Sequence, residues 1–188
     1  MVASPKKGRD YSGMNALELV MKRRSIRKFL DQPVSEDLLR DLLRAAMAAP
    51  SACNAQPWEF VVVTQADMLE QLRGILPFGK MTAPAAIVVC GNPLKAKNAA
   101  GKVFWVQDCS AATENLLVAA TGMGLGSVWI GVHPIPGLGK RISNLLHLPA
   151  YVSPLCVVYV GFPGEEKEIH TKYDENRVHW QTYNGKTI

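Results

Sequence analysis

The sequence predicts an α/β or α+β sandwich, that is, one domain in which helices cover a central sheet. A length of 188 residues is enough to bury a single core. The composition, with 48% hydrophobic and 20% charged residues, is that of a folded globular protein. Segments with helical spacing of apolar residues alternate with short β-branched runs, which is typical of layered folds. We expect residues 1–10 to form a flexible tail and residues 11–188 to form one domain.

The first half of the chain contains helix starts that can be recognised from their caps. Asn15 is a good N-cap, and Glu18 stands three residues later, as in a capping box. Ser35 is expected to cap a second helix, whose apolar residues repeat at helical spacing until Pro50 ends it. After that helix, the pattern predicts a strand at 60–64, a short helix at 67–76 and a strand at 85–90.

The second half begins with a long, largely buried helix, expected over residues 103–121. The glycines of "GMGLGS", residues 122–127, follow this helix and precede a strand at 128–132. A dinucleotide-binding fingerprint requires the opposite order, so we interpret these glycines as a helix terminator with left-handed dihedral angles. The chain then predicts a helix at 139–146, a strand at 155–160, and from Phe162 a polar extension that needs a partner surface.

Positive charge is concentrated near the N-terminus of a chain whose net charge is +5. Such a cluster is typical of binding to nucleic acid, to an anionic membrane or to a phosphate, and it also occurs as a solvated face. Nucleic-acid binding is disfavoured, because the Ala-rich helices and the amide-bearing loop at 50–58 serve it poorly. No apolar run is long enough to predict a membrane span, and no apolar core follows the first charges to predict a secretory signal.

The cysteines and histidines show no metal-binding spacing, so no metal site is predicted. Cys90 and Cys156 stand in apolar runs and are interpreted as buried, small hydrophobic residues. This cysteine usage is typical of a reducing compartment, and we expect a cytoplasmic protein. A nucleophilic role for Cys53 is disfavoured, because no histidine can be assigned as its base.

The stretch "RRSIRKF" places several cations close together at the end of the first helix. Arg23, Arg24 and Arg27 are spaced so that two or three guanidinium groups share one side. A guanidinium presents a planar fork of donors that matches phosphate oxygens, and Ser25 adds a hydroxyl donor. A phosphate site and a solvated basic face remain the two interpretations.

The stretch "PSACNAQPW" carries two amide side chains just before a buried strand. Asn54 and Gln56 are two residues apart, so in an extended segment both would point to the same face. Two amides there would match the edge of a heterocycle with alternating carbonyls and ring nitrogens. The alternative is a plain turn. Further along, Gly131 near a strand end permits a flat ligand to approach the backbone, or has a structural role only.

In combination, these stretches resemble the nitroreductase family of flavin enzymes. "RRSIRKF" and "SEDLLRDLLRAAMAAPSACNAQPWEFVVVT" carry the resemblance, and "APAAIVVC", "GLGSVWIG" and "KYDENRVHW" follow in the expected order. The resemblance covers about Met14 to Trp180. It implies an α+β fold, a three-layer α-β-α sandwich with a mixed, mostly antiparallel central sheet flanked by helices. It also implies a homodimer with an exchanged C-terminal extension.

The resemblance further implies an FMN site. The family's phosphate ligands would correspond to Arg23, Arg24, Ser25, Arg27 and, in the C-terminal segment, Arg177. The flavin ring would lie along Pro50, Ser51, Asn54 and Gln56, and would meet backbone amides of Trp129, Ile130 and Gly131. No side chain is predicted to be catalytic, because flavin N5 carries the chemistry.

The implied activity is that of an NAD(P)H-dependent FMN oxidoreductase. Such an enzyme takes a hydride from NADH or NADPH and reduces a second small-molecule electron acceptor, such as a nitroaromatic or a quinone, by a ping-pong mechanism. The alternative is an FMN-binding sensor or flavin carrier without turnover. Two positions depart from the family pattern: Ile130 stands where many members have Glu before the glycine, and Cys53 replaces a small residue.

Overall fold

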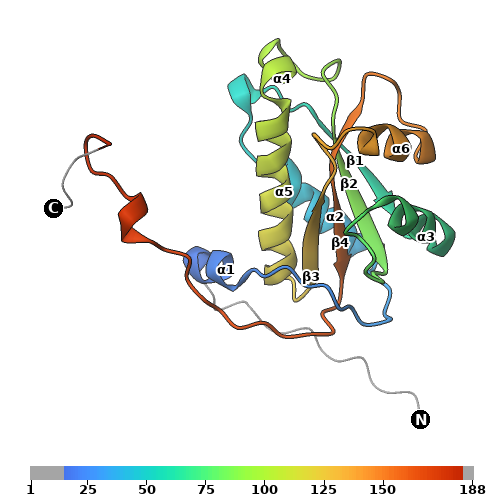
Figure 1. Ribbon diagram of the computed structural model, residues 1–188, viewed down its shortest axis with the longest axis horizontal. Coiled ribbons are helices and arrows are strands. Elements are labelled where there is room, and N and C mark those ends of the chain that lie inside the picture. The colour runs from blue at the N-terminus through green and yellow to red at the C-terminus, as the bar shows by residue number, and fades with distance from the viewer. Residues whose placement is uncertain (1–14, 184–188) are drawn as a thin grey trace.

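The computed structural model describes residues 15–183 as a four-stranded sheet with helices on both faces (Figure 1). The strand order is β1-β2-β4-β3, and every neighbouring pair is antiparallel. The expected α+β sandwich is therefore confirmed, while the tail expected at 1–10 lies outside the described residues. The strands are β1 (Trp58–Val63), β2 (Ala85–Gly91), β3 (Gly126–Gly131) and β4 (Ser153–Gly161).

The helices form two layers, one on each face of the sheet. Apolar residues of α2 and α5 pack on one face, and those of α3 and α6 pack on the other. The central strand β2 alternates between them, because Ile87 and Val89 join the first cluster whereas Val88 and Cys90 join the second. The helices are α1 (Ala16–Lys22), α2 (Glu36–Met47), α3 (Ala66–Ile75), α4 (Ala100–Val103), α5 (Trp105–Gly122) and α6 (Leu138–Leu145), with short 3-10 turns η1 (Ala52–Asn54) and η2 (Glu175–Arg177).

The predicted caps are present. Asn15 accepts from the backbone N–H of Glu18 at 3.0 Å, and the Glu18 carboxylate accepts from that of Asn15 at 3.0 Å. The Ser35 hydroxyl accepts from the backbone N–H of Leu38 at 3.3 Å. These contacts satisfy donors that a helix leaves unpaired in its first turn. The expected long helix at 103–121 is divided, because Phe104 departs from helical dihedral angles between α4 and α5.

The glycines after α5 end the helix, as the sequence predicts. Gly124 has a φ of 74°, in the left-handed region. The N–H of Leu125 donates to the carbonyl of Ala120 at 2.8 Å, and that of Gly124 donates to Thr121 at 3.2 Å. This pair of bonds is a Schellman motif, which satisfies the last carbonyls of the helix and turns the chain into β3.

The two edges of the sheet differ. The outer edge of β3 is covered by the segment after α1, because Ser25 forms a parallel bridge with Ser127. The outer edge of β1 has no strand beside it within residues 15–183. A groove of about 350 Å³ runs along that edge, lined by side chains of α2, of β1 and of the chain around Pro149.

The chain after β4 leaves the body of the molecule. Phe29 and Pro163 form an antiparallel bridge, and the following residues run past α1 and away from the sheet (Figure 1). Residues 164–183, called here the C-terminal extension, are mostly exposed. The extension thus has the form expected of a segment that packs elsewhere, and its packing on a partner stays a prediction. None of the described helices combines the length and apolar character needed to cross a membrane.

Candidate functional site

The basic segment, defined here as residues 23–28, lies along the start of β3. Ile26 donates its backbone N–H to the carbonyl of Ser127 at 3.0 Å, and its side chain is buried. A Cβ on Gly126 would lie only 2.8 Å from Cγ2 of Ile26, so the close approach requires a glycine there. The cations of this segment are therefore held at one end of β3.

Arg23 and Arg24 use their guanidinium groups within the protein. Arg23 Nε lies 3.3 Å from a carboxylate oxygen of Glu114 on α5. Arg24 donates to the carbonyls of Met21, Arg23, Glu168 and His170 at 2.7–3.0 Å. Four bonds occupy most of the five N–H donors of an arginine. Arg24 therefore anchors the C-terminal extension to the basic segment, and its phosphate role stays a prediction.

Arg27 presents a more available guanidinium. Its side chain is exposed, and within the described residues its only recorded contact is Nη1 to the carbonyl of Ser25, at the long distance of 3.4 Å. The backbone of Arg27 is held firmly, because its N–H donates to a carboxylate oxygen of Glu165 at 2.6 Å. A fixed backbone with a free planar fork is suited to binding an oxyanion.

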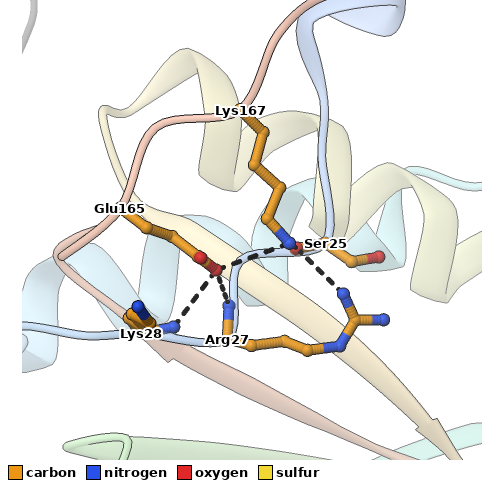
Figure 2. Close-up of polar contacts among 5 residues, drawn as sticks. All are labelled: Ser25, Arg27, Lys28, Glu165 and Lys167. Atoms are coloured by element: carbon orange, nitrogen blue, oxygen red, sulfur yellow. Dashed lines mark hydrogen bonds and ion pairs between the residues drawn. The ribbon is translucent and has the colours of Figure 1, made fainter.

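Glu165 and Lys167 join the basic segment from the C-terminal extension (Figure 2). Glu165 also accepts from the N–H of Lys28 at 3.3 Å and lies 3.5 Å from the ammonium of Lys167. Lys167 donates to the carbonyl of Ser25 at 2.8 Å. The N–H of Arg27 and the charge of Lys167 hold the pKa of Glu165 below its usual value, against a smaller opposing effect of burial.

Arg177, the expected C-terminal phosphate ligand, does not reach the basic segment of its own chain. It lies in η2, pairs with Asp174 at 3.1 Å and keeps a side chain that is 86% exposed. In Figure 1 this short helix lies on the far side of α1 from the sheet. Sequence reasoning passed over Lys167, although its position six residues after β4 keeps it near the end of that strand. A role for Arg177 toward a partner protomer stays a prediction.

The Glu165 contact makes a prediction about pH. The pKa of Glu165 is lowered on folding, so its ionised carboxylate stabilises the folded state. This contribution to the free energy of unfolding is complete above the ordinary carboxyl pKa of 4.5, and it is lost as the pH falls through the folded-state pKa. We expect the amide resonance of Arg27 in ¹⁵N–¹H NMR spectra to titrate with a midpoint below 4.5. Glu165→Gln removes that titration, and the control Glu168→Gln leaves it unchanged. A midpoint at or above 4.5 would contradict the assignment.

The loop with the two amides is not extended, so the expected placement of Asn54 and Gln56 on one face of an extended chain is wrong. Cys53, Asn54 and Gln56 have φ values of 48°, 55° and 49°. Left-handed dihedral angles at residues other than glycine cost roughly 1–3 kcal/mol each. Ser51 closes the turn by accepting the N–H of Gln56 at 3.1 Å. Pro50 and Asn54 are exposed, whereas Ser51 and Gln56 are half-buried.

The far end of β3 is open at Gly131. The side chain of Ile130 is buried and that of Trp129 is half-buried, but a Cβ on Gly131 would meet no atom of residues 15–183 within 4 Å. Strand residues rise by roughly 3.3 Å each, so Gly131 lies about 13 Å along β3 from Ser127. The ring of His133, just beyond, contacts that of Trp105 with centroids 4.9 Å apart. The end of β3 is therefore beside the first turn of α5.

The amide loop lies at that same end of α5. The backbone N–H of Ala52 donates to a carboxylate oxygen of Asp108, in the first turn of the helix, at 2.9 Å. The cations of the basic segment thus lie beside the start of β3, and the open backbone of Gly131 lies at its end. The amide loop is near that end. This arrangement suits a long ligand with an anionic group at one end and a flat group at the other.

The buried thiols add no chemistry to the site. Burial raises the pKa of Cys90 and of Cys156 to about 12, and it raises the pKa of Cys109 as well. At neutral pH these groups are protonated and poor nucleophiles. Within residues 15–183 no group of three His, Cys, Asp or Glu side chains is placed to hold a metal ion.

Comparisons with known proteins show which sequences this chain is similar to. The profile of the "Nitroreductase family" matches residues 20–80 and 74–162. A relative from Methanothermobacter thermautotrophicus, named "Putative NADH dehydrogenase/NAD(P)H nitroreductase", is 41% identical over 174 residues, which cover 92% of this chain and 90% of that protein. FMN reductase (NAD(P)H) of Bacillus subtilis is 28% identical, covering 85% of this chain and 71% of its own.

A solved structure gives the same result for the fold. The FMN-dependent nitroreductase of Clostridium difficile R20291 superposes with a TM-score of 0.80 at 31% identity, covering 89% of this chain and 99% of that one. The layers described above are thus those of a known architecture over nearly the whole chain.

Proposed function

This chain belongs to the nitroreductase family and is an NAD(P)H-dependent oxidoreductase with FMN as its cofactor, and we propose that it works by a ping-pong mechanism. In the first half-reaction it takes a hydride from NADH or NADPH and releases the nicotinamide. In the second it reduces a small acceptor, such as a nitroaromatic or a quinone, in the same pocket. Bound FMN supplies hydride acceptance at N5 and delivery of the electrons to that acceptor.

The observation that carries this proposal is the arrangement of groups along β3. The basic segment lies at its start, and the open backbone of Gly131 lies about 13 Å further along the strand. In FMN a ribityl chain joins the phosphate to the ring, and the distance from the phosphate to the pyrimidine edge of the ring is of comparable length. The space beside Gly131 is filled by no side chain of the described part of the chain, and it fits the edge of a flat ring.

The residues near the phosphate end have a binding role. Arg27 binds the phosphate through the planar fork of its guanidinium group, and Lys167 binds it as a single compact charge. Arg23 also contributes, although its guanidinium group pairs with Glu114 as well. Ser25 offers a hydroxyl donor in the same segment. These groups fix one end of the cofactor and leave the ring free to be approached by either substrate.

At the ring end, Asn54 and Gln56 provide amides, and the backbone at Gly131 provides an N–H group. The N–H of Ile130 faces β4 instead, as does that of Val132, which donates to the carbonyl of Leu155. Donors near the ring stabilise the charge that develops on its pyrimidine edge when electrons arrive. Backbone donors suffice for this, so the carboxylate that many members carry before the glycine is dispensable. No side chain is required as a general acid or base.

We propose a homodimer that exchanges its C-terminal extension. The extension leaves the body with large apolar side chains exposed, among them Ile169, Tyr173 and Trp180. The groove along the open edge of β1 has apolar walls and unpaired backbone groups, which suit an extended segment. Sedimentation equilibrium is expected to give twice the 20.6 kDa chain mass. A protein that remains monomeric at micromolar concentration would contradict this assembly.

The activity is tested by the colour of the purified protein. We expect the absorption spectrum of a bound flavin, and its anaerobic bleaching on addition of NADH or NADPH. Subsequent addition of a quinone or a nitroaromatic is expected to restore the colour. A colourless protein that binds no added FMN would refute the proposal. Tight FMN binding without bleaching by either nucleotide would favour the alternative, a flavin sensor or carrier without turnover.

A further inference from the structure

The amide loop has a conformation that its own sequence disfavours. Three residues without the freedom of glycine, Cys53, Asn54 and Gln56, have positive φ within four positions. Such a conformation persists only where surrounding contacts determine it. The hydrogen bonds inside the loop are few. The Ser51 hydroxyl accepts the N–H of Gln56, the carbonyl of Ser51 accepts the N–H of Asn54 at 3.0 Å, and the carbonyl of Ala52 accepts the N–H of Ala55 at 2.9 Å. The remaining support comes from outside the loop.

Asp108, in the first turn of α5, supports the loop through a hydrogen bond. Its side chain is 4% exposed, and Oδ1 accepts the N–H of Ala52 at 2.9 Å. Its other oxygen, Oδ2, is buried and has no hydrogen-bond partner among the described residues. A buried carboxylate oxygen without a partner opposes folding. Core packing alone does not account for an oxygen at this buried position, whereas accepting the N–H of Ala52 does.

Asn98 supports the loop from the side. Its Nδ2 donates to the carbonyl of Cys53 at 2.8 Å, and its Oδ1 accepts the N–H of Ala100 at 3.0 Å. These two bonds fix which atom of the amide faces the loop. The same connection, residues 92–101, holds the loop further along, because the N–H of Lys97 donates to the carbonyl of Ala55 at 2.9 Å.

Close packing joins this connection to the loop. A Cβ on Gly101 would lie 2.4 Å from Cβ of Ala96 and 3.2 Å from Cβ of Ala55, so the chains are in direct contact there. The turn η1 and the helix α4 are also neighbours. The loop is thus held between the first turn of α5 and residues 92–101.

We propose that Asp108 and Asn98 are positioning residues that hold the amide loop in its strained conformation and thereby aim Asn54 and Gln56 at the flavin ring. This inference rests on the proposed function, since it takes the ring to lie beside the loop. Neither Asp108 nor Asn98 touches the ring. Each acts through the backbone of the loop, Asp108 through Ala52 and Asn98 through Cys53.

The test compares three variants with one control. Asp108→Ala removes the acceptor for Ala52, and Asn98→Asp removes the donor to Cys53 while keeping the bond to Ala100. Asp108→Asn keeps an acceptor oxygen and serves as the rescue. The control, Asn115→Ala, removes a bond of 3.1 Å from the same helix to the carbonyl of Ala45, away from the loop.

Three readouts are measured: the dissociation constant for FMN from flavin fluorescence quenching, the visible circular dichroism of bound FMN, and the melting temperature. We expect Asp108→Ala and Asn98→Asp to weaken FMN binding at least fivefold and to change the dichroism band. Asp108→Asn is expected to stay within twofold of the wild type. Asn115→Ala is expected to lower the melting temperature without changing affinity or dichroism.

A mutant cycle tests whether the effect passes through the loop. Asn54→Ala is expected to weaken FMN binding by a smaller factor in the Asp108→Ala background than in the wild type, because the amide is already misplaced. If Asp108→Ala does not fold, the affinity and dichroism of Asn98→Asp test the inference alone, because Asn98 is only half-buried. Unchanged affinity and dichroism in Asn98→Asp, or fully independent effects in the cycle, would overturn the inference. A wild-type protein that binds no FMN would instead refute the proposed function.

Discussion

The variant Arg27→Ala is expected to bind FMN about 10- to 100-fold more weakly than the wild type while keeping its fold. Hydrogen bonds to a charged group contribute roughly 1.5–3 kcal/mol, and about 1.4 kcal/mol corresponds to a factor of ten in affinity. The guanidinium of Arg27 is exposed and makes one long contact within the described residues, so its removal leaves little unpaired behind. Titration of the apoprotein with FMN, followed by fluorescence, measures the effect.

An exposed arginine on α2 serves as the matched control. Arg44 is in the last turn of α2, is exposed and pairs with Asp41 on the same helix. Arg44→Ala removes the same charge from the chain, so it accounts for any general electrostatic effect on an anionic ligand. We expect its FMN affinity to stay within twofold of the wild type. Equal losses in both variants, or unchanged flavin occupancy in Arg27→Ala, would remove Arg27 from the phosphate site.

The variant Gly131→Val is expected to lose FMN affinity by at least tenfold without loss of stability. The Cβ position of Gly131 is open and its φ is not in the left-handed region, so the side chain enters without strain. A β-branched residue also suits a strand. The new methyl groups occupy the space assigned to the flat ring, and this prevents its close approach to the backbone. Thermal unfolding without FMN and FMN titration separate the two effects.

Gly139 offers the comparison for this change. It lies on α6, and an added Cβ would make an ordinary contact of 3.8 Å with Pro154. Gly139→Ala is therefore expected to fold normally and to bind FMN as the wild type does. If Gly131→Val bound FMN normally, the ring would have to lie away from the end of β3. If it failed to fold, the open space beside Gly131 would be misassigned.

Local chemistry explains why most of the fold was predictable. Two helix starts were predictable from their caps, Asn15 with Glu18 and Ser35. A short polar side chain at this position accepts the backbone N–H three residues later, and this contact depends only on nearby residues. The alternation along β2 and the Schellman glycine after α5 depend equally on neighbours in the sequence. Predicted bounds differ from the observed ones by a few residues, because strand ends depend on pairing with distant segments.

The site was less predictable, because its geometry depends on contacts between segments far apart in the sequence. The amide loop looks extended when Asn54 and Gln56 are considered alone, but Asp108 and Asn98 hold it in a left-handed turn. Arg24 resembles its neighbours in the sequence, yet the carbonyl groups of the C-terminal extension occupy its donors.

The distribution of the four cysteines has a practical consequence. Cys90, Cys109 and Cys156 are buried, while Cys53 is exposed on the amide loop. An alkylating dye or a nitroxide spin label added to the native protein would therefore attach at a single place, without any cysteine having to be engineered away. The attached reporter would lie beside the proposed position of the ring. The emission of the dye, or the spectral line shape of the spin label, would then change when the nicotinamide nucleotide or the acceptor binds and dissociates.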